Sequence, residues 1–117
     1  MKENLILKKT YDFAIRIVNL HTHLCEKTRK FEIAKQILRS GTSIGANTEE
    51  AIGAESKKDF IHKMSIAYKE ARETKYWLRL LRDTNTLERD IAQSLINDLE
   101  QILAIIGKIK ITSSKHS

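Results

Sequence analysis

The sequence predicts an all-α protein, an antiparallel up-down four-helix bundle in a single domain of residues 1–117. Apolar side chains recur three and four residues apart along most of the chain, which places them on one face of a helix. No segment of the sequence shows the strict alternation, bounded by turn residues, that a half-buried strand requires. The length of 117 residues suits one hydrophobic core and is too short for two.

The first two helices are expected over residues 10–27 and 31–53, separated by the polar run from Lys27 to Lys30. The apolar line of the first helix is formed by Phe13, Ile17, Leu20 and Leu24. The inner face of the second helix steps by four and three through Ile33, Ile37, Ser40, Ile44, Asn47 and Ala51.

The other two helices are expected over residues 57–83 and 87–111, with 112–117 as a frayed tail. Ser56 and Asp59 form a capping-box start for the third helix, and the turn formers from Asp83 to Thr86 end it. The third inner face comprises Phe60, Met64, Ala67, Ala71, Thr74, Leu78 and Leu81. The fourth comprises Leu87, Ile91, Leu95, Leu99, Ile102, Ile106 and Ile109.

The stretch GTSIG, from Gly41 to Gly45, matches the G-x-S-x-G motif of serine hydrolases and would make Ser43 a nucleophile. That motif requires a sharp turn between a strand and a helix. Here the preceding residues, EIAKQILR, are helix formers, and the helical spacing continues through the motif. A phosphate-binding loop is excluded too, because the Gly-Lys-Ser/Thr ending is missing. We therefore expect no catalytic residue and no enzymatic activity.

Gly41 and Gly45 lie four residues apart and therefore stack on one helical face. Small residues at this spacing let another helix backbone approach closely. Each glycine costs about 1 kcal/mol of helix propensity relative to alanine, so close packing must offset about 2 kcal/mol. Both glycines are expected at a tight helix–helix contact.

The segments RSGTSIGANTEEA and SKKDFIHKMSIAYKEARETKYWLRLL resemble a four-helix bundle family named for open reading frames in intervening sequences of large-subunit ribosomal RNA. The resemblance covers nearly the whole chain and is densest from Gln36 to Leu81. The family pattern of the second helix falls on Arg39, Ser43, Ile44, Asn47 and Glu50. That of the third falls on Ser56, Asp59, Phe60, Ala67 and Glu73. Thr48 stands where an apolar residue is usual, which loosens the expected packing slightly.

This resemblance implies an up-down bundle that forms ring-like homo-oligomers, often pentamers, with no catalytic activity established for the family. Some relatives, the accessory variability determinant proteins of diversity-generating retroelements, are basic and work with a reverse transcriptase and RNA. The resemblance therefore implies self-association, and RNA or a nucleic-acid-handling enzyme as a partner.

Four cations on the third helix, spaced three, four and three apart, form what we call the basic ridge: Arg72, Lys75, Arg79 and Arg82. They could follow a phosphate backbone, and Tyr76 beside them could stack on an unpaired base. A second group, the junction cluster of Lys27, Arg29 and Lys30, lies between the first two helices, with Lys35 nearby. The alternative for both groups is a solvated, solubilising surface, partly neutralised by Glu70, Glu73 and Asp83.

Arg39, Asn47 and Glu50 are expected to form a structural polar network at the inner face of the second helix, with Arg72 as another possible partner of Glu50. A buried glutamate needs a cation or a donor. Such a network would fix helix register, and a binding pocket is the alternative.

His21 and Cys25 lie one helical turn apart, whereas His23 points to the other side of the helix. Two ligands do not make a zinc site, so we expect neither a metal nor another cofactor. The single cysteine rules out an internal disulfide, and no apolar run is long enough to cross a bilayer. A signal peptide is not recognisable either. The expected location is the cytoplasm.

Several apolar residues exceed what one bundle core needs, which favours a subunit interface. These are Ile61, Tyr68, Tyr76, Trp77 and Ile105. The excess of 21 Lys and Arg over 15 Asp and Glu gives a net charge of +6, which suits a polyanionic partner. The sequence thus leaves two functions: a nucleic-acid-binding homo-oligomer, or a protein-interaction scaffold with no nucleic-acid role.

Overall fold

Four long α-helices and one short π-helical turn make up the computed structural model, which describes residues 2–115 and the side chains of residues 5–115. In chain order they are α1 (Lys2–His23), the π-helical turn η1 (Leu24–Thr28), α2 (Phe31–Ile52), α3 (Lys57–Asp83) and α4 (Arg89–Lys115). The described residues contain no strand. The predicted all-α class is confirmed.

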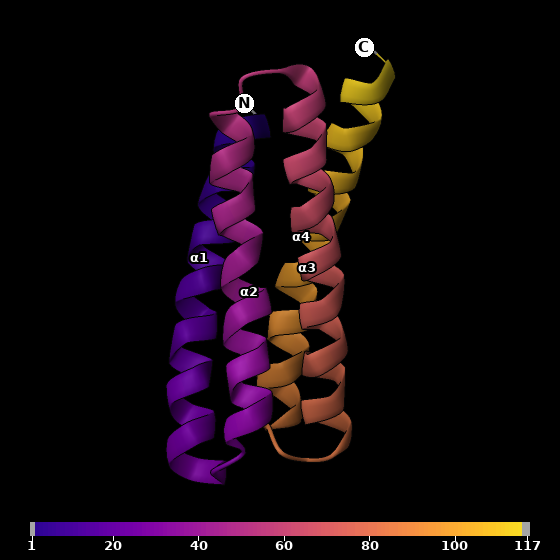
Figure 1. Ribbon diagram of the computed structural model, residues 1–117. Helices are drawn as coiled ribbons and strands as arrows, with labels where there is room; N and C mark the ends of the chain where they lie inside the picture. The colour runs from indigo at the N-terminus through magenta and orange to yellow at the C-terminus, as the bar shows by residue number, and fades with distance from the viewer. Residues whose placement is uncertain (1, 116–117) are drawn as a thin grey trace.

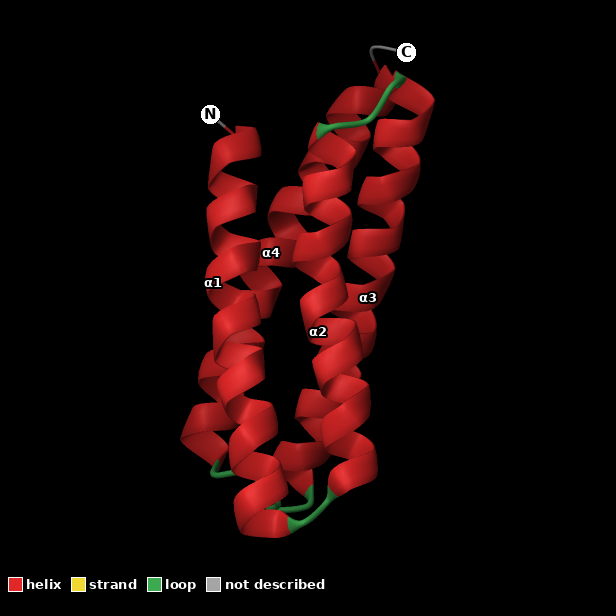
Figure 2. Cartoon of the chain, turned by 60° about the vertical axis from the view of Figure 1, so that its left-hand side comes forward, coloured by secondary structure: helices red, strands yellow, loops and turns green. Residues whose placement is uncertain are grey.

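The helices run alternately up and down a bundle that measures 47 × 21 × 19 Å. The α1–α2 and α3–α4 connections lie at one end, and the α2–α3 connection lies at the other, near both ends of the chain (Figure 1). Loops are confined to the two ends of the bundle (Figure 2). Each helix packs against its neighbours in sequence, and α4 closes the bundle against α1.

Helix α1 begins at Lys2, eight residues before the predicted start at residue 10. Ile6 and Thr10 are 0 % and 1 % exposed, so they extend the buried line of Phe13 towards the N-terminus. The Thr10 hydroxyl donates to the carbonyl of Ile6 at 2.8 Å, which satisfies it inside the helix. The predicted start was wrong because the inner-face spacing already includes Ile6.

The first helical segment does not end as one regular α-helix at residue 27, where the sequence placed its end. α-helical geometry stops at His23, and η1 carries the chain on to Thr28. Arg29 then takes a left-handed conformation with φ of 59°, and its backbone N–H donates to the carbonyl of Leu24. This residue turns the chain into α2.

Helix α4 begins at Arg89 and not at residue 87. Leu87 lies in the α3–α4 connection, yet it is only 3 % exposed, and its N–H bonds the carbonyl of Leu81. At the other end the helix continues through residues 112–115, so the expected frayed tail was wrong there, and residues 116–117 lie outside the described part. Lys115 places a positive charge in the last turn, where the helix dipole favours it.

The start of α3 follows the predicted capping arrangement. Ser56 has an extended backbone, and its hydroxyl oxygen accepts a hydrogen bond from the backbone N–H of Asp59 at 3.0 Å. The acid of Asp59 lies in the first turn, at the positive end of the helix dipole.

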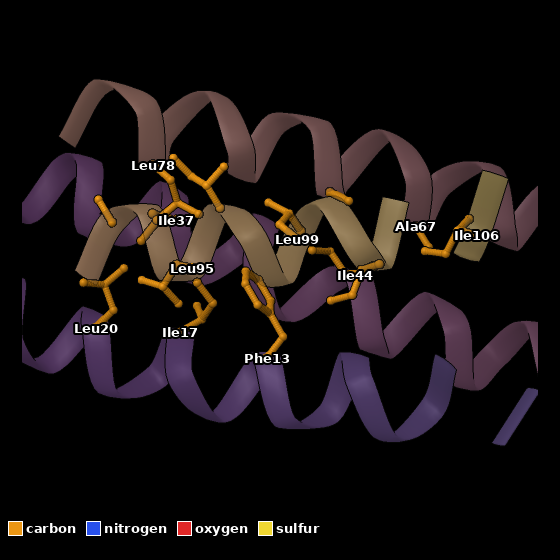
Figure 3. Packing of buried hydrophobic residues seen from close by; sticks show 14 of the residues in the cluster. Phe13, Ile17, Leu20, Ile37, Ile44, Ala67, Leu78, Leu95, Leu99 and Ile106 are labelled. Carbon is orange, nitrogen blue, oxygen red and sulfur yellow. The ribbon is translucent and has the colours of Figure 1, made fainter. Parts of the chain in front are cut away.

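Buried apolar side chains from all four helices meet along the bundle axis (Figure 3). The labelled members of this core are Phe13, Ile17, Leu20, Ile37, Ile44, Ala67, Leu78, Leu95, Leu99 and Ile106. The predicted inner faces are therefore largely the observed ones. Ile91 is an exception, since it is 42 % exposed beside the seam between α1 and α4.

Both glycines of GTSIG are buried and face α1. A Cβ atom on Gly41 would lie 2.8 Å from two side-chain carbons of Ile17, closer than real Cβ contacts come. A Cβ on Gly45 would lie 3.4 Å from the carbonyl oxygen of Thr10, in van der Waals contact. The missing side chain at Gly41 is thus what allows Ile17 its place in the core.

Candidate nucleic-acid interface

An open groove of about 490 Å³ runs along the seam between α3 and α4. Its α3 wall is made of Tyr68, Arg72, Lys75, Tyr76 and Arg79, and its α4 wall is made of Glu100, Leu103 and Ala104. We call it the α3–α4 groove. It brings together three members of the basic ridge and the tyrosine that the sequence placed beside them.

The helix geometry explains why these side chains line one groove. Arg72, Lys75 and Arg79 each follow a buried residue of the α3 inner face by one position, so they lie at the edge of that face. The opposite wall contains the small residue Ala104, and one turn on, a Cβ at Gly107 would lie 3.6 Å from the Tyr68 ring. Small residues on α4 thus leave room for large side chains from α3.

Positive charge dominates the groove. Arg72 and Arg79 are exposed, while Lys75 bonds Glu100 across the seam, with 2.5 Å between Nζ and Oε1. The ammonium group of Lys110 lies 4.9 Å from the centre of the Tyr68 ring, in a cation–π contact. The groove therefore offers two solvated guanidinium groups and a lysine that is held by a single carboxylate.

Tyr76 presents an aromatic surface at the groove. Its side chain is 52 % exposed, and its ring packs edge-on against Trp77 with 5.2 Å between ring centres and 70° between ring planes. Trp77 is held in turn, because its indole N–H donates to the carboxylate of Glu73 at 3.1 Å. An exposed ring with a fixed neighbour suits stacking on an unpaired base.

Arg82, the fourth member of the basic ridge, does not line the groove. Its guanidinium bonds Asp83 at 2.8 Å and also donates to the side chain of Gln93 at 3.1 Å. The hydrogen bond from Arg82 is the main reason why the pKa of Asp83 lies below its usual range. The structure thus separates Arg82 from the other three, because the helix ends there and its neighbours bind it.

The junction cluster lies at the end of the bundle where α1 passes to α2. Arg29 and Lys30 line a second groove of about 710 Å³, together with Phe31, which is 54 % exposed, and the C-terminal end of α3. Lys27 is exposed but does not line this groove. Two of the three cluster members therefore share a surface with an exposed aromatic ring.

The predicted polar network of Arg39, Asn47 and Glu50 does not form. Glu50 is 56 % exposed and pairs with Lys63 at 2.8 Å, so the expectation of a buried glutamate was wrong. The Asn47 amide donates to the backbone carbonyl of Ser43 in its own helix. A helix turns by about 100° per residue, which is enough to carry position 50 out to solvent while Ala51 is buried.

Arg39 instead reaches across to α3. It bonds Glu70 at 3.0 Å and also bonds Glu73. Burial raises the pKa of Glu73, but hydrogen bonds from Trp77 and Arg39 and the charges of Arg39 and Lys69 outweigh burial and hold that pKa below its usual range. The hydrogen bond to Glu73 is also the main cause of the raised pKa of Arg39.

A buried pair of hydroxyl groups was missed by the sequence reasoning. Thr74 of α3 donates to Ser40 of α2 at 2.9 Å, and both side chains are 0 % exposed. The sequence did contain an indication of this pair, because Ser40 and Thr74 both occupy inner-face positions that otherwise hold mostly apolar side chains. The Thr74 hydroxyl also lies 2.8 Å from the backbone carbonyl oxygen of Glu70, so the pair is hydrogen-bonded within the core and joins α2 to α3.

Residues 2–108 match the model of a family described as 23S rRNA-intervening sequence protein. The chain belongs to this family. It is also similar to a crystal structure from Bacteroides thetaiotaomicron, described as a protein of unknown function from the S23 ribosomal protein family, with 48 % identity and a TM-score of 0.92. The match covers 94 % of this chain and 98 % of the other. No match was found among curated proteins.

The serine of the segment GTSIG lies inside α2. The Ser43 hydroxyl donates to the backbone carbonyl of Arg39 at 2.6 Å, as helical serines commonly do. The strand and turn of a nucleophile elbow are absent around it.

His21 and Cys25 do meet, with 3.7 Å between Nε2 and Sγ. Within residues 2–115, no group of three or more His, Cys, Asp or Glu side chains could hold a metal ion. Nor does that part of the chain contain a helix with the length and hydropathy of a membrane span.

The surplus apolar residues are distributed differently from the prediction. Tyr68, Trp77 and Ile105 are half-buried against the core of this chain, and Ile61 is also partly buried. Tyr76 is the one predicted surplus residue that is exposed. Exposed apolar side chains occur on all four helices, and three of them follow one another at helical spacing on α1. We define this α1 stripe as Tyr11, Ile15 and Val18, which are 65 %, 48 % and 49 % exposed. Their spacing of four and three was visible in the sequence, but the buried face of the same helix obscured it.

Proposed function

We propose that this protein is a non-enzymatic RNA-binding protein that works as a homo-oligomer in the cytoplasm. The observation that carries the proposal is the α3–α4 groove, which places Arg72, Lys75 and Arg79 around the exposed ring of Tyr76. Cations spaced along a groove contact successive phosphates, and an aromatic ring among them stacks on a base.

The groove favours single-stranded over double-stranded RNA. Stacking on Tyr76 requires a base whose face is free, which a duplex does not offer. Each phosphate contact releases counterions, so binding should be strongly salt-dependent. Phosphate contacts and stacking by themselves depend little on sequence. RNA is the nucleic acid to test first, because the family description refers to 23S rRNA. A homo-oligomer would repeat the groove on each subunit and raise the overall affinity.

The absence of enzymatic activity is part of the proposal. Ser43, which carries the hydrolase-like motif, uses its hydroxyl proton within its own helix. Its neighbours in the motif, Gly41 and Gly45, have a packing role against α1.

A second candidate function, a protein-interaction scaffold, is favoured by the α1 stripe. Tyr11, Ile15 and Val18 leave large apolar side chains in solvent along one helix, as docking surfaces commonly do. The same surface would serve self-association, so a homo-oligomer is compatible with both functions. A measurement of RNA binding is therefore what distinguishes the two candidate functions.

The test is filter binding of single-stranded and duplex RNA at several salt concentrations. Arg72→Glu with Arg79→Glu should weaken single-strand binding and reduce the slope of log affinity against log salt by about 1.4 per groove, since each phosphate contact contributes about 0.7. Lys58→Glu with Arg89→Glu makes the same charge change at two exposed residues outside the groove and is the matched control. Failure of the wild type to bind at low salt would leave the scaffold function.

A further inference from the structure

Glu100 is the one acidic side chain among the described residues that line the α3–α4 groove. A carboxylate weakens phosphate binding by repulsion, so a groove that only followed a backbone would bind better without it. Glu100 lies on α4, opposite the α3 cations, and contacts Lys75, the residue next to Tyr76 in the chain. Tyr76 and Glu100 line the same groove, so a base stacked on Tyr76 would lie near this carboxylate.

The ion pair between Lys75 and Glu100 opens at little cost. Their side chains are 34 % and 51 % exposed. Ion pairs at this exposure contribute little to stability, because water and salt screen both charges. An RNA phosphate can take Lys75, and the released carboxylate is then free to accept hydrogen bonds from a base.

The chemistry of a carboxylate distinguishes the four bases. Guanine presents two adjacent donors on its Watson–Crick edge, N1–H and the N2 amino group, and these match the two carboxylate oxygens. Adenine and cytosine place an acceptor nitrogen next to their amino group, and uracil flanks its single N–H with two carbonyl oxygens. Only guanine can therefore donate to both oxygens at once, because its own acceptor on that edge, O6, lies outside the donor pair.

We propose that the α3–α4 groove selects an unpaired guanine, which stacks on Tyr76 and donates both Watson–Crick hydrogens to Glu100. This preference rests on the proposed RNA-binding function. Arg72 and Arg79 hold the flanking phosphates, and Lys75 moves from Glu100 to the RNA. Bidentate recognition of this kind discriminates between bases by about tenfold or more.

The experiment measures fluorescence anisotropy of labelled uridine octamers that carry one central guanosine, adenosine or inosine. Inosine keeps N1–H and lacks the N2 amino group, so it retains one of the two hydrogen bonds. The full-length wild type should bind the guanosine octamer about tenfold more tightly than the adenosine octamer, with inosine between them. Glu100→Gln should bind all three about equally, and the adenosine octamer at least as tightly as wild type does, because it lacks the repelling charge.

Asp98→Asn is the matched control, since Asp98 lies on the same helix but pairs with Arg16 of α1, outside the groove. This variant should keep the wild-type preference. Equal binding of all three octamers by the wild type, or a guanosine preference that survives in Glu100→Gln, would overturn the guanine proposal and leave RNA binding intact. No binding of any octamer by the wild type would overturn both.

Discussion

Arg39 of α2 and Trp77 of α3 donate hydrogen bonds to the same oxygen atom, Oε2 of Glu73. This shared acceptor joins the two helices and fixes the indole against which the Tyr76 ring packs. The exposed tyrosine of the α3–α4 groove is thus held from behind by a chain of contacts that begins on α2. Its position depends on residues that do not themselves line the groove.

Glu73 should make stability depend on acid pH. The pKa of Glu73 in the folded state lies below its usual value, so the ionised carboxylate favours folding. This contribution to stability is complete above the unfolded-state pKa. It is lost as pH falls through the folded-state pKa. Urea unfolding between about pH 7 and pH 3 should show stability falling with acid. Asp83 adds to the same trend. Glu73→Gln should have a shallower dependence than wild type, and an unchanged dependence would contradict the role given to this carboxylate.

The two glycines of GTSIG should respond differently to alanine. Gly41→Ala places a Cβ against Ile17 in the core and should destabilise the protein by about 1–3 kcal/mol. Gly45→Ala has room beside Thr10 and gains up to about 1 kcal/mol of helix propensity, so its stability should equal or exceed that of wild type. Gly45→Leu should again destabilise by overpacking. Equal urea midpoints for Gly41→Ala and Gly45→Ala would refute this difference.

The α1 stripe should carry self-association. Wild type at micromolar concentration should scatter light as a species larger than the 13.5 kDa chain. Ile15→Glu puts a charge into the middle of the stripe and should shift the protein towards the monomer while circular dichroism stays helical. Ile61→Glu, at one of the residues first expected to form the interface, should disturb association less. A wild-type monomer would contradict self-association itself.

Much of the fold could be predicted because inner-face spacing depends only on helix geometry. Ile17, Ile44 and Leu78 are buried as their spacing required. It is harder to predict whether a side chain at the edge of a face is buried or exposed. Because a helix turns by about 100° per residue, such a side chain can lie in the core or in solvent. Glu50 proved solvent-exposed for this reason, and Arg39 found its partners on another helix.

The candidate site was predictable only on one of its walls. Arg72, Lys75 and Arg79 share one helix, so their common side followed from spacing alone. Glu100 is distant in sequence, and nothing in its local pattern indicates that it meets Lys75. Contacts between helices depend on their relative rotation and register, which a single helix does not encode.

The most direct test of RNA binding in the α3–α4 groove uses Trp77, the single tryptophan of the chain and the neighbour of Tyr76. Titration with a single-stranded RNA should change its fluorescence with saturation, and duplex RNA should change it much less. Tyr76→Ala should weaken the single-strand affinity by about 1–3 kcal/mol, the usual contribution of one stacked base. If filter binding detects a complex but saturating RNA leaves the Trp77 emission unchanged, and Tyr76→Ala binds as wild type does, the RNA lies elsewhere and the account is wrong.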